Sequence, residues 1–333
     1  MTTMRDVAQR AGVTAMTVSR VINNSGYVSE GTRRKVESAI AELQYMPNDL
    51  ARHFRQQQTQ TIALMLSDIT NPFWSTVIRG VEQTLTAEGL TLILSNADNS
   101  PARQAEQIHN LLCKQMDGII LSPTESSARL IQPIQRQKTP LVVIDQQIPG
   151  AEVDTVRGDS VEGAYRLTKL LLALGHRRIA ALSGPRSTAT AVERVAGYRR
   201  ALTEAGLPPD ESLIHYGQFT IESGYQMARQ VLGLPQPPTA IFAANNFVAL
   251  GVSRMLEEMR LRIPEDVSVV TFDWASDYAL HPPFFTMAAI SGYEMGRQAA
   301  NLLLRRLTGS SAPVQDMVLP AAITEHRSTA PPI

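Results

Sequence analysis

Apolar and polar positions alternate with a helical period near the start of the chain. Thr3 and Asp6 have the spacing of a capping box, which places the start of a first helix near Met4. Its narrow apolar face consists of Val7, Ala8 and Ala11. Gly12 can adopt the positive φ that ends a helix, so the pattern predicts a helix followed by a tight turn.

Two further helices are predicted after this turn. Thr14 caps the second, with Val18, Val21 and Ile22 facing inward and Ala15, Met16, Thr17, Ser19 and Arg20 facing outward. Ser29 caps the third, which runs from about Glu30 to Leu43 with Val36, Ile40 and Leu43 on its inner face. Residues 1–46 are therefore expected to form a three-helix head.

The outer face of the second helix suits the major groove of DNA, where the start of such a helix meets base edges. Arg20 can offer two parallel donors to guanine, whereas Ala15 and Met16 can offer only apolar contact, for example to a thymine methyl group. Thr17 and Ser19 suit phosphate contacts. Spacing alone fits an ordinary helical hairpin equally well.

The identities of the residues in this stretch are more specific than the helical spacing of its apolar positions. The runs Asp6-Val7-Ala8, Ala11-Gly12-Val13 and Thr17-Val18-Ser19-Arg20-Val21, with Asn23, closely resemble the DNA-binding head of the LacI/GalR family of bacterial transcription repressors. The resemblance implies a homodimer that binds palindromic double-stranded operator DNA under the control of a small effector, usually a sugar. The DNA-contacting residues would be Thr14, Ala15, Met16, Thr17, Ser19, Arg20, Asn23, Arg52 and Phe54.

Residues 47–60 are expected to be a hinge helix and linker. Pro47 breaks the preceding helix, and residues 48–54 can form about two helical turns, too few to be stable alone. The stretch resembles the family's hinge helix, which wedges a leucine into the minor groove. Phe54 stands at the wedge position here, and phenylalanine can also kink DNA. The alternative is that Phe54 only caps a linker.

From Thr61 the pattern changes to apolar strands separated by helices of ten or more residues, which is typical of a doubly wound α/β fold with parallel sheets. We expect two lobes joined by crossing strands near Val153–Val156 and Ala288–Ile290. The predicted division is 61–159 with 292–319, and 160–291 with 320–333. The expected strands are 62–66, 90–94, 118–121, 141–144, 179–182, 239–243 and 267–272. This architecture resembles periplasmic sugar-binding proteins.

Ligands in such folds bind beyond the carboxyl ends of the strands, and polar and aromatic side chains follow several of the predicted strands. Carboxylates, amides and arginine bind sugar hydroxyls, while aromatic rings stack on the apolar face of a sugar. Matched to the family, the effector contacts fall on Phe73, Asp145, Arg194, Phe219, Asn246 and Asp273. Trp74, which follows the first strand, is added to the predicted effector-binding residues as an aromatic that can stack on the ring. Trp274 is a further aromatic candidate, whereas a capping role is as good for Thr188, Thr190 and Asn245.

The class of effector stays open between a neutral sugar and a sugar acid. Asn246 stands where many relatives have aspartate, and Ser160 where they commonly have asparagine. Arg194 could pair with the carboxylate of a sugar acid, and Met16-Thr17-Val18-Ser19-Arg20 resembles gluconate-responsive members. Neutral sugar is slightly favoured.

Composition agrees with a globular protein that has an uneven charge distribution. The chain has 333 residues, of which 44% are hydrophobic, and a net charge of zero. Residues 1–60 carry eight Lys and Arg against five Asp and Glu, so the head is basic, as DNA binding requires. With no membrane-spanning run and no signal peptide, we expect a cytoplasmic protein without a membrane partner. The single cysteine, Cys113, is expected to be inert core.

Catalysis is not expected. None of the nucleophile-elbow, phosphate-loop or dinucleotide motifs occurs, and the six histidines show no metal-ligand spacing, so neither a metal nor a cofactor is predicted. Two other functions remain: a stand-alone sugar receptor, and a glycoside hydrolase using Asp145 and Asp273. The C-terminal segment 323–333 contains no heptads, which favours a dimer over a coiled-coil tetramer.

Overall fold

The computed structural model describes residues 2–46, 59–273 and 284–333, and the chain divides into two compact units, 1–59 and 60–333. In the first unit, three helices enclose a small core; they are α1 (Met4–Ala11), α2 (Ala15–Ile22) and α3 (Glu30–Glu42). The core is made of Val7, Ala8, Val18, Val21, Val36, Ala39 and Tyr45. The sequence pattern predicts all three helices.

The helix ends of this unit form as their sequences indicate. Asp6 Oδ2 accepts hydrogen bonds from the backbone N–H and the hydroxyl of Thr3, both at 2.7 Å, and the Thr3 hydroxyl accepts from Asp6 N–H. Gly12 ends α1 at a φ of 67°. Thr14 then caps α2 by accepting from the Thr17 N–H at 3.2 Å. These local bonds fix the turn between the two helices.

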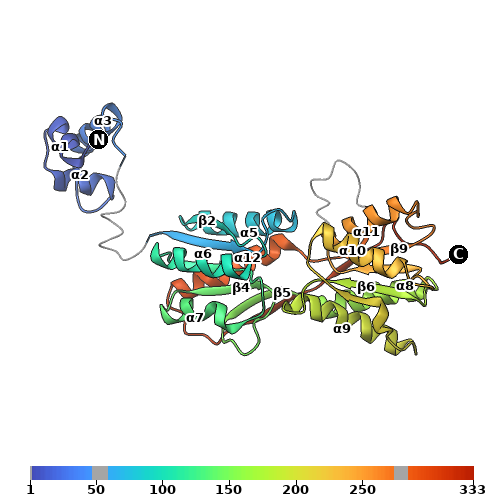
Figure 1. The fold of residues 1–333 in the computed structure, drawn as a ribbon. Helices are drawn as coiled ribbons and strands as arrows, with labels where there is room; N and C mark the ends of the chain where they lie inside the picture. Colours follow the sequence, from blue (N-terminus) through green and yellow to red (C-terminus); the bar gives the residue numbers. More distant parts are fainter. Residues whose placement is uncertain (1, 47–58, 274–283) are drawn as a thin grey trace. The chain divides into compact units, whose positions relative to one another are not determined.

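The second unit contains two six-stranded sheets, each flanked by helices (Figure 1). The first sheet is entirely parallel, in the order β11-β5-β4-β3-β1-β2. Its strands are β1 (Thr61–Leu66), β2 (Thr91–Asn96), β3 (Gly118–Leu121), β4 (Leu141–Asp145), β5 (Asp154–Gly158) and β11 (Asp316–Leu319). Its helices are α5 (Phe73–Ala87), α6 (Pro101–Cys113), α7 (Ala128–Arg136) and α12 (Gly292–Leu307).

The second sheet has the order β12-β10-β9-β8-β6-β7, and only the β10–β12 pair is antiparallel. Its strands are β6 (Ile179–Ser183), β7 (Ile214–Tyr216), β8 (Ala240–Ala243), β9 (Ser268–Phe272), β10 (Thr286–Ala289) and β12 (Ala322–Thr324). Its helices are α8 (Ser160–Ala173), α9 (Ala189–Glu204), η1 (Glu211–Leu213), α10 (Ile221–Leu232) and α11 (Asn246–Glu258).

Alternate strand residues pack against opposite helix layers, which explains why the strands are apolar throughout. In β1, Ile62, Leu64 and Leu66 pack with α5 and α12, whereas Ala63 and Met65 pack with α6 and α7. The second sheet is likewise covered by α8 and α9 on one face and by α10 and α11 on the other. The central strands of both sheets are therefore buried on both faces, whereas the edge strands β2, β11 and β12 are partly exposed.

Small residues bring paired helices into close contact. A Cβ added to Gly80 in α5 would lie 2.1 Å from the Tyr293 carbonyl oxygen, and one added to Gly296 in α12 would lie 2.1 Å from that of Val77. Because real Cβ contacts are never so short, only glycine fits at these two positions. This contact holds α12, which follows β10 of the second sheet in the chain, against α5 of the first sheet.

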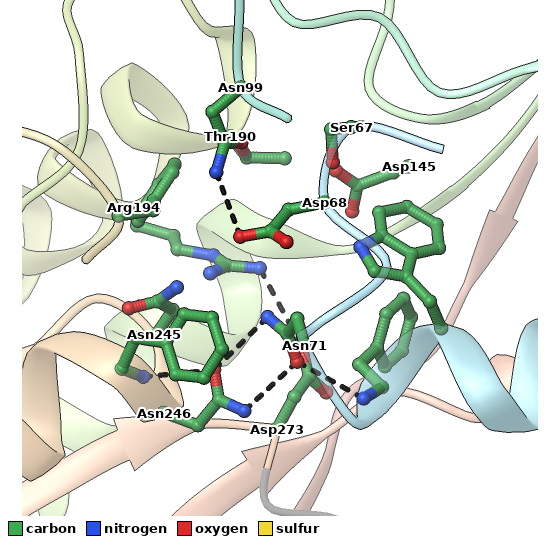
Figure 2. A pocket seen from close by; sticks show the side chains of 14 residues that line it. Ser67, Asp68, Asn71, Asn99, Asp145, Thr190, Arg194, Asn245, Asn246 and Asp273 are labelled. Atoms are coloured by element: carbon green, nitrogen blue, oxygen red, sulfur yellow. Dashed lines mark hydrogen bonds and ion pairs between the residues drawn. The ribbon is translucent and has the colours of Figure 1, made fainter. Parts of the chain in front are cut away.

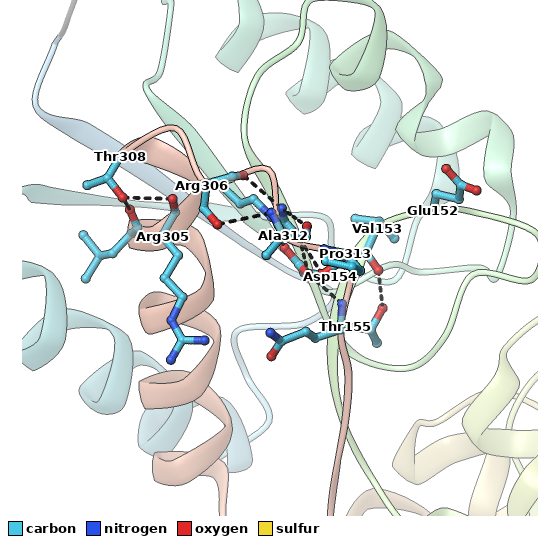
Figure 3. A network of polar contacts seen from close by, with 12 residues as sticks. Glu152, Val153, Asp154, Thr155, Arg305, Arg306, Thr308, Ala312 and Pro313 are labelled. Atoms are coloured by element: carbon cyan, nitrogen blue, oxygen red, sulfur yellow. Dashed lines mark hydrogen bonds and ion pairs between the residues drawn. The ribbon is translucent and has the colours of Figure 1, made fainter.

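A polar network holds the segment that joins α12 to β11 (Figure 3). Arg306 donates to both carboxylate oxygens of Asp154, at 2.6 and 2.9 Å, and to the carbonyls of Ser310, Ala312 and Pro313. Asp154 also accepts from the Gln315 N–H at 2.8 Å, although its side chain is only 2% exposed. The network thus ties the end of α12 to the start of β5.

The C-terminal segment completes the second lobe. The Ser328 hydroxyl donates to the Val269 carbonyl and accepts from the Thr286 N–H, while Ala330 exchanges two bonds with the Ser268 hydroxyl. His176, whose pKa is lowered by burial, bonds the Ala330 carbonyl at 2.9 Å. These bonds join the chain's end to β9, β10 and the end of α8.

Cys113 does not lie where the sequence predicts, and the hinge segment lies outside the described residues. Cys113 is exposed, so its assignment to the core is wrong. It is the last residue of α6 and lies beyond the buried stripe of that helix, which ends at Leu111 and Leu112. The predicted hinge helix over 48–54 lies outside the described residues. Within the described ranges, no helix is long and apolar enough to cross a membrane.

Candidate functional site

One pocket between the two lobes collects all seven side chains that the sequence assigned to effector binding: Phe73, Trp74, Asp145, Arg194, Phe219, Asn246 and Asp273 (Figure 2). The remaining lining residues are Ser67, Asp68, Asn71, Asn99, Thr190, Asn245 and Phe247. Sequence reasoning placed several of these in loops after strands without selecting them. Trp274 lies outside the described residues.

The pocket lies at the carboxyl ends of the parallel strands. Asp145 is the last residue of β4, and Asp273 follows β9 directly. Both adopt left-handed backbone conformations, at φ of 74° and 49°, which end the extended strands. Arg194 comes from α9, and Phe73 and Asn246 are the first residues of α5 and α11. The site therefore draws on both lobes, as expected at such an edge.

Arg194 is the central cation of the pocket. Its side chain is 6% exposed, lies over the Phe272 ring at 4.0 Å, and donates to the Ala244 carbonyl. Its ion pair with Asp273 is long, at 3.8 Å between Nη2 and Oδ2. Nε is buried and has no hydrogen-bond partner among the described residues. A buried donor without a partner is unfavourable, so this guanidinium has unused bonding capacity.

Two carboxyl groups lie near this cation. Burial raises the pKa of Asp145 to about 6, against the lowering influence of Arg194 and with a further increase from Asp273. Burial likewise raises the pKa of Asp273 to about 6, while Arg194 and the Ile290 N–H, which donates to Asp273 Oδ1 at 2.9 Å, oppose the shift. Burial also lowers the pKa of Arg194 itself. Both aspartates therefore titrate close to neutral pH.

Aromatic side chains form another part of the lining. The Phe73 and Trp74 rings meet edge to face with centroids 5.2 Å apart, and Trp74 is buried. Phe219 lies against Gly184, where an added Cβ would be 2.4 Å from the ring. Gly184 thus leaves room for this ring beside the pocket.

Thr188, Thr190 and Asn245, for which helix capping was an equal alternative, have different positions relative to the pocket. Asn245 caps α11 by accepting from the Val248 N–H at 2.8 Å, and it also lines the pocket. Thr190 lines the pocket, whereas Thr188 donates to the Pro185 carbonyl and lines a separate groove. The described residues include no group of three or more metal-binding side chains that could hold a metal ion.

The candidate DNA surface lies on α2. Met16 is 67% exposed, and Arg20 and Asn23 are also exposed, while Ala15 is only partly so. Several predicted DNA contacts already have local partners: the Thr14 and Thr17 hydroxyls share a hydrogen bond, and the Asn23 amide donates to the Ser19 carbonyl. Arg52 and Phe54 lie outside the described residues. Met16 and Arg20 thus have the side chains most available to another molecule.

Comparison with known proteins identifies the family. Residues 3–48 match the model for bacterial regulatory proteins of the lacI family, and residues 59–327 match that for periplasmic binding proteins and the sugar-binding domain of the LacI family. The chain belongs to the LacI family. It is therefore a DNA-binding transcriptional regulator with a sugar-binding type of sensor domain, and not an enzyme.

Individual relatives extend over nearly the whole LacI-family chain. The ribose operon repressor of Escherichia coli K12 is 35% identical over 329 residues, covering 98% of this chain and all of that protein. The lac repressor dimer bound to operator and the anti-inducer ONPF is 28% identical, with a TM-score of 0.87 and 99% of each chain covered. A LacI-family regulator from Enterococcus faecium with bound ribose is 33% identical, with a TM-score of 0.72, covering 81% and 99%.

Proposed function

We propose that this LacI-family regulator senses a small neutral sugar in the interlobe pocket and represses transcription by binding a palindromic operator as a homodimer in the cytoplasm. The observation that carries the choice of ligand is the charge of the pocket. Arg194 is flanked by Asp145 and Asp273, and Asp68 also lines the pocket. Hydroxyl groups can donate to these carboxylates and accept from the unpartnered Nε of Arg194.

A sugar acid suits this arrangement less well. Its carboxylate would lie near two buried carboxylates that already surround the guanidinium, and like charges are costly at such separations in a buried site. A neutral sugar introduces no charge, and Phe73 and Phe219 can contact the apolar face of its ring. The regulator with bound ribose, similar over most of the sensor domain, supports a sugar of this size.

Repression follows from linkage between pocket and operator. A sugar that binds one lobe arrangement better than another shifts the population of lobe arrangements, and by reciprocity alters DNA affinity. In a dimer, two heads would read the half-sites of a palindrome. The hinge segment with Arg52 and Phe54 would form its helices only in the DNA-bound arrangement. A coupling of about 1–3 kcal/mol would change operator affinity roughly 5- to 150-fold.

A ligand screen tests the sensor. The purified protein is heated with D-ribose, other neutral sugars, gluconate, sugar phosphates and nucleobases, since ligand at 100 times its Kd stabilises by about 2.7 kcal/mol. We expect a neutral sugar to raise Tm in the parent and in Arg103→Ala, a surface control, but not in Arg194→Met. Stabilisation by gluconate alone would overturn the choice of a neutral ligand.

A second experiment tests the DNA surface. We expect Arg20→Ala to weaken operator binding roughly 5- to 150-fold, because a bidentate contact with guanine contributes about 1–3 kcal/mol. The control is Arg10→Ala, which removes an exposed arginine of the same head that pairs with Glu42 at 2.6 Å. Affinities are measured by fluorescence anisotropy on an operator selected in vitro. Equal affinities for both variants would show that α2 is not the reading helix.

A further inference from the structure

Two asparagines meet across the pocket, one from each lobe. Asn71 Nδ2 donates to Asn246 Oδ1 at 3.2 Å, and Asn246 Nδ2 donates to Asn71 Oδ1 at 3.0 Å. The residues are 175 positions apart in the chain; Asn246 is buried and Asn71 is half-buried. Figure 2 shows the dashed lines that join the Asn71 and Asn246 side chains. The two hydrogen bonds thus directly connect the two lobes.

The orientation of each amide is set by its own helix. The Phe73 N–H, in the first turn of α5, donates to Asn71 Oδ1 at 3.1 Å. The Phe247 N–H, in the first turn of α11, donates to Asn246 Oδ1 at 2.9 Å. Because a backbone N–H must face an oxygen, each side chain presents its Nδ2 to the partner amide. A flip of either amide would break all three of these bonds to it.

We propose that Asn71 and Asn246 form an amide clasp that holds the two lobes together. Asn246 then acts on effector affinity through lobe closure, and Asn71 contributes to closure as much as Asn246 does. An amide is required at both positions, since each must donate and accept. An aspartate at 246 accepts from Asn71 but cannot donate back, and it adds a charge to a pocket lined by Asp145 and Asp273. The clasp makes position 246 a determinant of closure.

A second set of hydrogen bonds between the lobes, away from this pocket's lining, is built differently. There the Ala189 N–H donates to the Ser126 hydroxyl and to Gln146 Oε1, at 2.8 and 2.9 Å, and the Ser126 N–H donates to the Ser187 carbonyl. Backbone groups take part in each of these bonds, so side-chain replacement removes only some of them. The clasp is made by side chains alone. It can therefore be removed without replacing any residue of this second set of bonds.

The first test measures the lobes and needs no ligand. One spin label is attached to native Cys113 on α6 and one to a second cysteine introduced by Gln230→Cys on α10, since both positions are exposed. Labelled protein is diluted with unlabelled Cys113→Ser chains, so that distances within one chain dominate. We expect Asn71→Ala, Asn246→Ala and Asn246→Asp each to broaden the distance distribution toward longer separations. The double alanine variant should match either single one.

The control for this test is Asn99→Gly. Asn99 lines the same pocket, but its amide donates to Asp68 within the first lobe at 3.0 Å, and its φ of 53° suits glycine. Its distance distribution should match that of the parent. If Asn71→Ala and Asn246→Ala also match the parent, the clasp does not hold the lobes and the proposal is overturned.

The second test measures D-ribose binding by calorimetry, and rests on the proposed neutral-sugar function. We expect Asn71→Ala and Asn246→Ala to lower affinity equally, about fivefold to thirtyfold, with no further loss in the double variant. A loss in Asn246→Ala alone would assign that amide to direct ligand contact and overturn the clasp. If the parent does not bind ribose, the choice of ligand fails, while the distance measurement still decides the clasp.

Discussion

Arg306 and Arg194 both lie beside buried aspartates, yet their hydrogen-bonding groups are used very differently. Arg306 donates to both oxygens of Asp154 and to three carbonyls, and Asp154 accepts a further backbone N–H. Arg194 meets Asp273 only at 3.8 Å and keeps a buried Nε without a partner among the described residues. The first pair completes its bonds within the fold. The second retains donors and acceptors that a ligand can use.

The largest expected effect follows from breaking the Arg306 pair. Asp154→Ala would leave the Arg306 guanidinium without its counterion and the Gln315 N–H without its acceptor, so we expect the free energy of unfolding to fall by about 3 kcal/mol. Urea unfolding followed by circular dichroism measures it. The matched variant is Asp273→Ala, which should cost less because that ion pair is longer. A larger loss in Asp273→Ala would reverse the comparison.

Replacing both members of each pair sharpens the distinction. Arg194→Met with Asp273→Asn should leave Tm close to that of the parent, since exchanging a whole buried pair is often neutral or stabilising. The same replacement of Arg306 and Asp154 should lower Tm, because the carbonyls of Ser310, Ala312 and Pro313 lose their donor. Only the first double variant should lose sugar binding. Thermal unfolding with and without D-ribose measures both properties.

The raised pKa values of the pocket predict a pH dependence. Asp145 and Asp273, each with a pKa of about 6, bind more protons folded than unfolded between about pH 4 and 6, so their contribution to stability falls as pH rises through this window. The pH dependence of sugar affinity should have the opposite sign, because sugar hydroxyls donate to the ionised carboxylates. Affinity for D-ribose should fall by up to about tenfold per pH unit for each carboxylate that must be ionised, as the pH drops below 6. Calorimetry from pH 5 to 8 checks this, and Asp145→Asn should flatten the profile.

The smallest effect is expected at an exposed pair of the same chemistry. Arg10 and Glu42 lie 2.6 Å apart in the head, with side chains 56% and 51% exposed. Solvent and salt screen such a pair, so Glu42→Gln should not change Tm measurably. A clear decrease in Tm that 0.5 M salt removes would show that a short distance between two charges matters more than their burial. It would also contradict the comparison of the Arg306 and Arg194 pairs.

Much of the fold could be read from local sequence signals. The capping residues Thr3, Thr14 and Ser29 correctly locate the helix starts of the head, and the apolar runs locate most strands within two residues. Three strands were not predicted: β7, β11 and β12. Each has three or four residues and forms a sheet edge, so it needs no continuous apolar run.

The site was harder to predict in its details. The family resemblance and the positions of strand ends predicted the seven lining residues, because each of these signals lies within a single strand, helix or loop. The Asn71–Asn246 pair depends on how two lobes meet, and no local pattern contains that geometry. Asn71 lies in the loop after the strand predicted at 62–66, where ligand contacts are expected, but nothing in the sequence pairs it with Asn246. The pKa values of Asp145 and Asp273 likewise arise only from burial in the folded chain.

The bonds of the C-terminal segment have a genetic consequence. Ser328 and Ala330 hydrogen-bond to β9 and β10, so the last residues are part of the second lobe and not an appendage. A nonsense mutation just before the Ser328 codon should act as a loss-of-function allele although the head and nearly all of the described sensor are translated. A purification tag placed after Ile333, whose side chain is fully exposed, should be tolerated.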